Sequence, residues 1–155
     1  MAKSGKKNKK DAKSLQIKNK KAYWNYELIE KIEAGICLSG TEVKSLRAGC
    51  CDLSGSYARF IDGELFLVGA NIAVYENAGY CSHQPDRNRK LLLHKRQLLK
   101  LRQKLEQKGF TIVPLRVYFT SRGHAKVEIA TAKGRKKYDD RDKLRDKQFR
   151  KELRY

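Results

Sequence analysis

Apolar and polar residues alternate from residue 26 to residue 38, a pattern typical of a strand with one buried face. The apolar residues within 28–32 also suit a helix. Directly behind this segment, Ser39 and Glu42 have the spacing of a capping box, and Gly49 provides a helix stop. The pattern predicts a strand followed by a short helix.

Two hairpins are indicated further along the chain. Asp62 and Gly63 lie between two strand-like segments, residues 56–61 and 64–72, and this dipeptide is a strong hairpin signal. Residues 110–119 are rich in β-branched and aromatic side chains, and residues 121–123 form a turn signal before a last strand at 125–130. Pro114 predicts a bulge or a sheet edge within the longer segment.

Residues 88–108 have the period of a basic helix. On a helical wheel, one stripe of about 80° collects five apolar or aromatic positions: Leu91, His94, Leu98, Leu101 and Leu105. Leu92 falls outside this stripe, beside Lys95 and Arg96. It is either an exposed apolar residue next to positive charge or the margin of a wide buried face, and the wheel does not separate the two.

These elements favour a mainly β fold, an OB-like closed antiparallel β-barrel with about three surrounding helices, over a sandwich. Residues 1–21 are nearly all Lys, Ser, Asn and Gly, and we expect a flexible basic arm. The RNA-binding body then covers residues 22–133. Residues 134–155 form a basic tail with few apolar residues, expected to be disordered when free.

The net charge of +19 is concentrated in residues 1–21, 86–108 and 133–155. Localised positive charge predicts a polyanionic partner, with RNA or DNA first, because phosphate neutralisation releases counterions. No apolar run approaches the roughly 20 residues of a membrane span, and the basic start lacks the apolar stretch of a signal peptide. We therefore expect a cytoplasmic protein.

Neither a metal site nor an enzyme is expected. The cysteines have no C-x-x-C spacing, and Cys81 with His83 would supply only two ligands, so ordinary thiols are the simpler interpretation. Asp139 and Asp140 would suit Mg²⁺ in a nuclease, but they lie in a basic tail without further ligands. No nucleophilic triad or phosphate-binding glycine loop is present, and no cofactor is predicted.

Several unusual strings recur in one order and at characteristic separations. Three of them are Glu-Ala-Gly-Ile at 33–36 with Gly-Thr-Glu-Val-Lys-Ser-Leu-Arg at 40–47, Arg-Asn-Arg-Lys-Leu-Leu-Leu-His-Lys at 87–95, and Ala-Lys-Gly-Arg-Lys at 132–136. Asn-Lys-Lys-Ala at 19–22 and Gly-Ala-Asn-Ile at 69–72 accompany them. With these strings, residues 17 to 141 resemble the SmpB family, the SsrA-binding proteins of bacteria.

The resemblance implies an RNA-binding protein of ribosome rescue with an OB-like barrel. Such proteins bind the tRNA-like domain of transfer-messenger RNA (tmRNA) and carry it, with elongation factor Tu, to stalled ribosomes. There they replace the missing codon–anticodon contact at the 30S decoding centre. Their tail becomes helical in the empty mRNA channel, against 16S rRNA.

The resemblance also assigns residues. Asn19, Glu33 and Leu92 would contact RNA, through base or ribose hydrogen bonds for the first two and apolar stacking on a loop base for Leu92. From the residues alone, Glu33 suits a structural ion pair better, because a carboxylate repels phosphate. The basic residues around them are expected to touch phosphates: Lys20, Lys21, Lys44, Arg47, Arg87, Arg89 and Lys90. Tyr23, Trp24 and Tyr26 are either stacking platforms or core.

The ribosome-binding tail is assigned in the same way to Gly134, Arg135, Lys136, Lys137, Tyr138, Asp139 and Arg141. Asp140 replaces a positive charge common in the family, and Tyr138 stands where some members have histidine. Opposite charges at helical spacing make a tail helix feasible but marginal in isolation. The main alternative is a general OB-fold RNA binder held mostly by phosphate charge.

Overall fold

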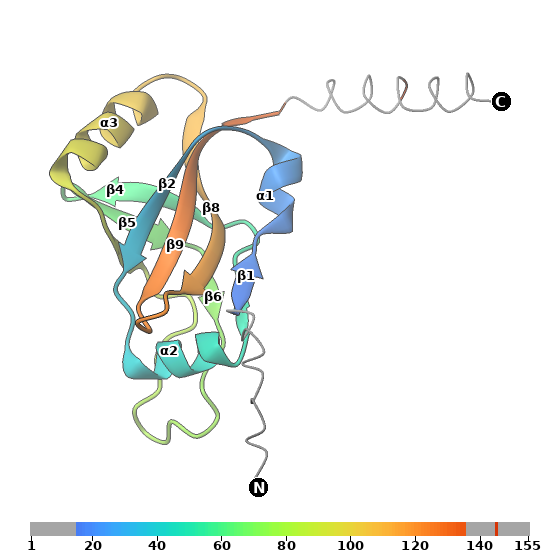
Figure 1. Ribbon diagram of the computed structural model, residues 1–155, viewed down its shortest axis with the longest axis vertical. Coiled ribbons are helices and arrows are strands. Elements are labelled where there is room, and N and C mark those ends of the chain that lie inside the picture. Colours follow the sequence, from blue (N-terminus) through green and yellow to red (C-terminus); the bar gives the residue numbers. More distant parts are fainter. Residues whose placement is uncertain (1–14, 136–144, 146–155) are drawn as a thin grey trace, which may run out of the picture.

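The computed structural model describes residues 15–135 and Arg145, and the fold within them is mainly β with three helices (Figure 1). No helix in this part of the chain is long and apolar enough to span a membrane. In chain order the elements are β1 (Gln16–Lys18), α1 (Lys20–Asn25), β2 (Tyr26–Ile36), α2 (Gly40–Arg47), β3 (Cys51–Asp52), β4 (Tyr57–Ile61), β5 (Glu64–Val68), β6 (Asn71–Ile72), β7 (Arg89–Leu92), α3 (Lys95–Leu105), β8 (Phe110–Phe119) and β9 (Ala125–Gly134).

The strand pairings of the main sheet return to the strand at which they start. From β8 they run through β4, β5, β7, β2 and β9, and β9 pairs with β8 again. All these pairings are antiparallel. Strand β1 adds to β8 near Arg116–Tyr118, whereas β4 meets the same strand at Ile112. Strands β3 and β6 form a separate small sheet.

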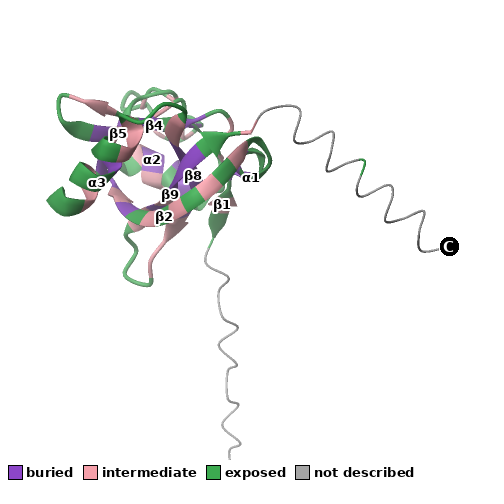
Figure 2. Ribbon diagram, turned by 90° about the horizontal axis from the view of Figure 1, so that it is seen from above, coloured by how far each residue is buried: buried purple, intermediate pink, exposed green. Residues whose placement is uncertain are grey.

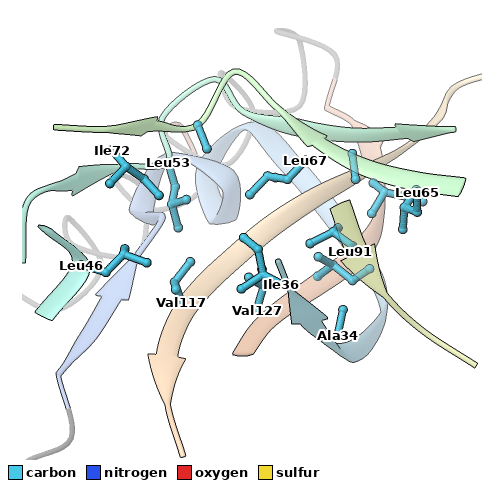
Figure 3. Packing of buried hydrophobic residues seen from close by; sticks show 14 of the residues in the cluster. Ala34, Ile36, Leu46, Leu53, Leu65, Leu67, Ile72, Leu91, Val117 and Val127 are labelled. Carbon is cyan, nitrogen blue, oxygen red and sulfur yellow. The ribbon is translucent and has the colours of Figure 1, made fainter. Parts of the chain in front are cut away.

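Apolar side chains from these strands fill one main core. Leu65 and Leu67 of β5, Val117 of β8 and Val127 of β9 belong to this core, and Leu46 of α2 lies at one side of it (Figure 3). Alternation on each strand places these residues inward and most charged residues outward, with Arg89 of β7 as a buried exception. Strands β8 and β9 each contain more buried residues than any other element, while α3 shows much of its surface to solvent (Figure 2).

Several sequence predictions are confirmed. The alternating segment forms β2, and Ser39 with Glu42 forms the capping box of α2. Asp62 and Gly63 have φ of 49° and 80°, as a two-residue hairpin turn with positive φ at both positions requires. The pairing of β8 with β9 shifts register between Pro114 and Arg116, which is the irregularity predicted at the proline.

The prediction of one helix over 88–108 is wrong in its first part. Residues 89–92 form β7, which pairs with β5 and β2, and the helix α3 begins only at Lys95. Strand alternation buries Arg89 and Leu91 and exposes Leu92. The backbone N–H of His94 donates to Gln97 Oε1 at 3.1 Å, which fixes the start of α3. The wheel therefore grouped Leu91 with a helix to which it does not belong.

The expected arm boundary at residue 21 also needs correction, because it falls inside α1. Residues 16–18 pair with β8, so the ordered body begins before residue 22. Residues 1–14 lie outside the described residues, as does the tail from 136 onward except for Arg145.

Candidate nucleic-acid interface

An outward-facing row of side chains crosses four strands. Leu92 of β7 is opposite Gly35 of β2, Gly35 is opposite Lys126 of β9, and Lys126 is opposite Tyr118 of β8. We call these four residues the Leu92 row. Leu92 is 50% exposed, and a Cβ added to Gly35 would lie 3.2 Å from the Leu92 Cβ. Glycine thus leaves room for the leucine, which remains an exposed apolar surface in a polar setting.

Glu33 lies beside this row and accepts hydrogen bonds from two of its members. Lys126 Nζ is 2.8 Å from Glu33 Oε1, and the Tyr118 hydroxyl donates to Oε2. The hydrogen bond from Lys126, followed by that from Tyr118, lowers the pKa of Glu33. Partial burial, followed by the hydrogen bond to Glu33, raises the pKa of Tyr118 to about 12. At neutral pH the pair is therefore a carboxylate and a protonated phenol.

Both interpretations of Glu33 have structural support. The ion pair that the residues alone favoured is present, yet half of the Glu33 side chain (52%) remains exposed. A carboxylate that is neutralised by lysine no longer repels phosphate strongly, and its free lone pairs can accept from a base amino group or a 2′-hydroxyl. The RNA contact of Glu33 and Leu92 stays a prediction.

Asn19 has a different role from the one predicted. Its side chain is buried, donates to the carbonyls of Leu53 and Pro114 at 3.0 Å each, and accepts from the Ala22 N–H at 3.2 Å. It caps α1 and ties the helix to two distant segments. Because these partners occupy the amide, its hydrogen bonds are not available to RNA bases in this conformation. Asn19 instead positions the helix that carries Lys20 and Lys21.

Arg89 is also directed inward, contrary to the expected phosphate contact. Its side chain is fully buried, and its Nε donates to Glu42 Oε1 at 2.9 Å. The other guanidinium nitrogens donate to the carbonyls of Ala70 at 2.7 Å and Pro85 at 2.8 Å. Arg87 donates to the same carboxylate from Nη2 at 2.6 Å, but its side chain is 41% exposed. Arg87 can therefore face an RNA, and Arg89 cannot.

The remaining predicted basic residues lie on the surface. Lys90 pairs with Glu64, Lys44 lies over the Tyr75 ring, and Arg47 lies over the Phe119 ring. Lys20 and Lys21 are exposed on α1. All five side chains are exposed or partly exposed, so each can reach a phosphate.

The aromatic residues of the α1 region divide between the two interpretations. Tyr23 and Trp24 are 42% and 75% exposed, so the core interpretation is wrong for them. Tyr26 is partly buried and packs against the smaller cluster under α1, as a core residue does. The Lys31 ammonium lies 5.7 Å from the centre of the Tyr23 ring. The exposed aromatics therefore lie among positive charges.

Comparison with known proteins identifies the family. The family model described as SmpB protein matches residues 16–155. The chain is 52% identical over 139 residues to the SsrA-binding protein of Solidesulfovibrio magneticus, with 90% of each chain covered. It is 54% identical over 125 residues to the SsrA-binding protein of Thermus thermophilus, covering 81% of this chain and 87% of that one. The chain belongs to the SmpB family.

A solved structure supports the same assignment. It is described as "tmRNA-SmpB: a journey to the center of the bacterial ribosome" and matches with a TM-score of 0.67 and 54% identity, over 79% of this chain and 85% of that chain. The SmpB resemblance seen in the sequence is thus confirmed for the family.

Of the residues assigned to ribosome binding in the SmpB tail, Gly134 and Arg135 fall within the described structure. Gly134 ends β9 opposite Tyr26, and the Arg135 N–H donates to the Asn25 carbonyl at 3.1 Å. The sheet therefore continues into the segment assigned to the tail. The other assigned residues, Lys136, Lys137, Tyr138, Asp139 and Arg141, lie outside the described residues, as does Asp140.

Sequence reasoning missed the partners of Glu33. Tyr118 and Lys126 are at outward positions of β8 and β9, and only the strand register brings them beside β2. Their alternation with the buried Val117 and Val127 indicates that both side chains face outward, but it does not show which strands are neighbours in the sheet. Within residues 15–135, no three His, Cys, Asp or Glu side chains gather as metal ligands would. His83 is instead hydrogen-bonded to Thr41 Oγ1 and the Ile72 carbonyl.

The buried Glu42 gives this SmpB-family protein a predictable response to acid. Burial alone raises the pKa of Glu42, but the hydrogen bonds from Arg87 and Ser39 and the charges of Arg89 and Arg87 outweigh it and set the pKa to about 2, against 4.5 ordinarily. The unfolded chain therefore takes up a proton before the folded chain does. Stability is fully present above about pH 4.5 and is lost as pH falls toward 2, by about 3 kcal/mol.

Urea unfolding followed by circular dichroism near pH 7 and near pH 3 should show about 2 kcal/mol of this loss, because pH 3 still lies above the folded-state pKa of Glu42. Glu42→Gln is the control, because glutamine does not titrate and should remove that share of the difference. An equal loss in both proteins would show that other carboxylates cause the acid sensitivity.

Proposed function

We propose that the chain binds the tRNA-like domain of tmRNA and brings it to stalled ribosomes for trans-translation. The observation that carries this proposal is the SmpB-family match over residues 16–155. The relatives named SsrA-binding protein and the solved neighbour described as tmRNA-SmpB in the bacterial ribosome support it. The protein acts by binding and positioning RNA, without catalysis of its own.

The Leu92 row supports recognition of RNA through loops rather than through a regular duplex. An exposed leucine offers nothing to phosphates, but it can stack on a base that has left its helix. Lys126 and the exposed part of the Glu33 carboxylate lie next to it and can form hydrogen bonds to ribose or to base edges. Lys90, Arg87, Lys20 and Lys21 are at least partly exposed, and in this proposal they contact phosphates and fix the position of the RNA backbone.

The proposed architecture is an OB-like closed barrel, and the strand pairings that return to β8 support it. In this proposal residues 22–133, together with β1, bind tmRNA, and residues 134–155 enter the mRNA channel at the 30S decoding centre next to 16S rRNA. Residues 1–21 include a basic arm. Elongation factor Tu joins through the tmRNA complex, and the protein works in the cytoplasm, where ribosomes are.

Competition binding at near-physiological salt tests the function. The tRNA-like domain of tmRNA, an ordinary tRNA and an unrelated hairpin compete for the full chain, and the first should win by at least about tenfold, because shape and base contacts add to phosphate charge. Leu92→Asp should remove most of this preference, since it places charge on the apolar contact.

Leu99→Asp is the matched control, because Leu99 is also an exposed leucine (62%) but lies on α3. It should leave the preference unchanged. Equal binding of all three RNAs by the unmodified chain would reduce the function to general RNA binding by charge. An unchanged preference in Leu92→Asp would remove the Leu92 row from the site.

A further inference from the structure

A second surface feature lies next to the Leu92 row, where α1 and β1 border β8 (Figure 1). A groove of about 500 Å³ opens there, and seven side chains from α1 and four strands or their ends line it: Lys18, Lys20, Tyr23, Trp24, Lys31, Arg116 and Glu128. Leu92, Glu33 and the buried Arg89 all lie outside the lining of this groove.

The groove is positively charged. Lys18, Lys20 and Lys31 are exposed on its wall. Its single acid, Glu128, is already paired with Arg116. The local balance therefore favours an anion, and three separate ammonium groups suit the phosphates of a nucleic-acid backbone better than one small anion.

The groove also presents an aromatic surface that the fold does not use. Trp24 is 75% exposed, because α1 buries Ala22 and turns Trp24 toward solvent. The neighbouring Tyr23 ring lies under Lys31. An indole among ammonium groups combines the two features by which proteins hold unstacked nucleotides, a stacking face and phosphate charge.

The groove is continuous with the candidate interface. Glu33 of β2 is opposite Glu128, Glu128 is opposite Arg116, and Arg116 is opposite Lys18. This row follows the Leu92 row along the same sheet face at a spacing of two residues, roughly 7 Å. The Arg116 guanidinium also lies 5.0 Å from the centre of the Tyr118 ring. An RNA that covers Glu33 therefore borders the groove, because Glu128 lines the groove and is paired with Glu33 in the sheet.

We propose that this groove holds an unstacked nucleotide of the same tRNA-like domain, with its base stacked on Trp24 and its phosphates between Lys18, Lys20 and Lys31. The inference rests on the proposed function and adds a second contact to it. Contacts at the Leu92 row and at the groove lie on both sides of Glu33. Together they would fix the orientation of the RNA on the protein as well as its position.

Trp24 itself provides the measurement, because it is the single tryptophan of the chain. Titration of the full chain with the tRNA-like domain should quench Trp24 emission and protect it from acrylamide, with a midpoint equal to the dissociation constant from filter binding. Trp24→Ala should weaken filter binding by about 5- to 50-fold, as expected for loss of one stacked base, and Trp24→Phe should recover most of it. Lys31→Glu should weaken binding in the same direction.

Tyr80→Ala is the matched control, because Tyr80 is a fully exposed aromatic residue outside the groove and should not change the affinity. If the tRNA-like domain binds while Trp24 emission and the Trp24→Ala affinity stay unchanged, the groove contact is refuted and the proposed function stands. Quenching by 30S subunits but not by the tRNA-like domain would also refute it. If the tRNA-like domain does not bind, both proposals fail.

Discussion

A chain that ends after Arg135 is expected to bind the tRNA-like domain of tmRNA as tightly as the full chain, yet to lose nearly all tagging of stalled peptides. The last backbone contacts of the described body are made by Gly134, which pairs with Tyr26, and by the Arg135 N–H, which donates to Asn25. This cut keeps both. The Leu92 row and the groove at Trp24 lie wholly within the part that is kept.

The expected loss of tagging rests on the proposed ribosomal contact of residues 136–155. Lysines and arginines alternate there with aspartates and glutamates, several at the spacing of helical pairs. Such pairs contribute only a few tenths of a kcal/mol each, so in the proposed function it is contact with ribosomal RNA that would supply most of the energy for ordering a helix there. Filter binding and a tagging assay on ribosomes stalled without a codon give the two readouts.

A shuffled tail of the same composition is the control for charge alone. It should bind the tRNA-like domain normally and tag poorly, because the order of residues sets which side chains meet the ribosome. Full tagging by the shorter chain would show that the body alone is sufficient, and full tagging by the shuffled chain would show that charge without order is sufficient.

The elements that the sequence predicted correctly are those determined by neighbouring residues. The capping box of Ser39 and Glu42 and the turn at Asp62 and Gly63 both involve side chains within three positions of each other. Strand β7 is different. Three successive leucines at 91–93 suit a helix as well as a strand, and its strand form comes from pairing with β2 and β5, far away in the chain.

The same distinction explains the site. Leu92 and Glu33 proved accessible, but Asn19 and Arg89 proved buried although each is polar and lies in a basic string. A buried polar side chain needs partners for its hydrogen bonds. Asn19 finds the carbonyls of Leu53 and Pro114, and Arg89 finds those of Ala70 and Pro85. Most of these partners are remote in sequence, so local pattern could not tell a structural residue from an RNA contact.

The largest loss of folding stability is expected for Glu42→Ala. Glu42 and Arg89 are both fully inaccessible to solvent, and Glu42 also accepts from Arg87 and from the Ser39 N–H at 2.8 Å. The alanine variant leaves the Arg89 guanidinium buried without a counter-charge, which costs about 3–5 kcal/mol. It also removes half of the capping box of α2, which adds about 1 kcal/mol. Together these losses are a large share of the stability of an ordinary domain.

Glu64→Ala is the matched control, because it breaks the pair with Lys90, in which the two side chains are 49% and 39% exposed. Its effect should stay within about 1 kcal/mol, since water replaces the lost partner. Urea unfolding near pH 7 should be followed by circular dichroism, because the exposed Trp24 is a poor reporter of core packing.

If Glu42→Ala and Glu64→Ala lower the free energy of unfolding equally, the buried Glu42–Arg89 pair matters no more to stability than an exposed ion pair. If the uncompensated charge is the cause, adding Arg89→Met to Glu42→Ala should recover part of the loss, because the double variant buries no unpaired ion. Recovery would be incomplete, because the carbonyls of Ala70 and Pro85 would then lack their donors.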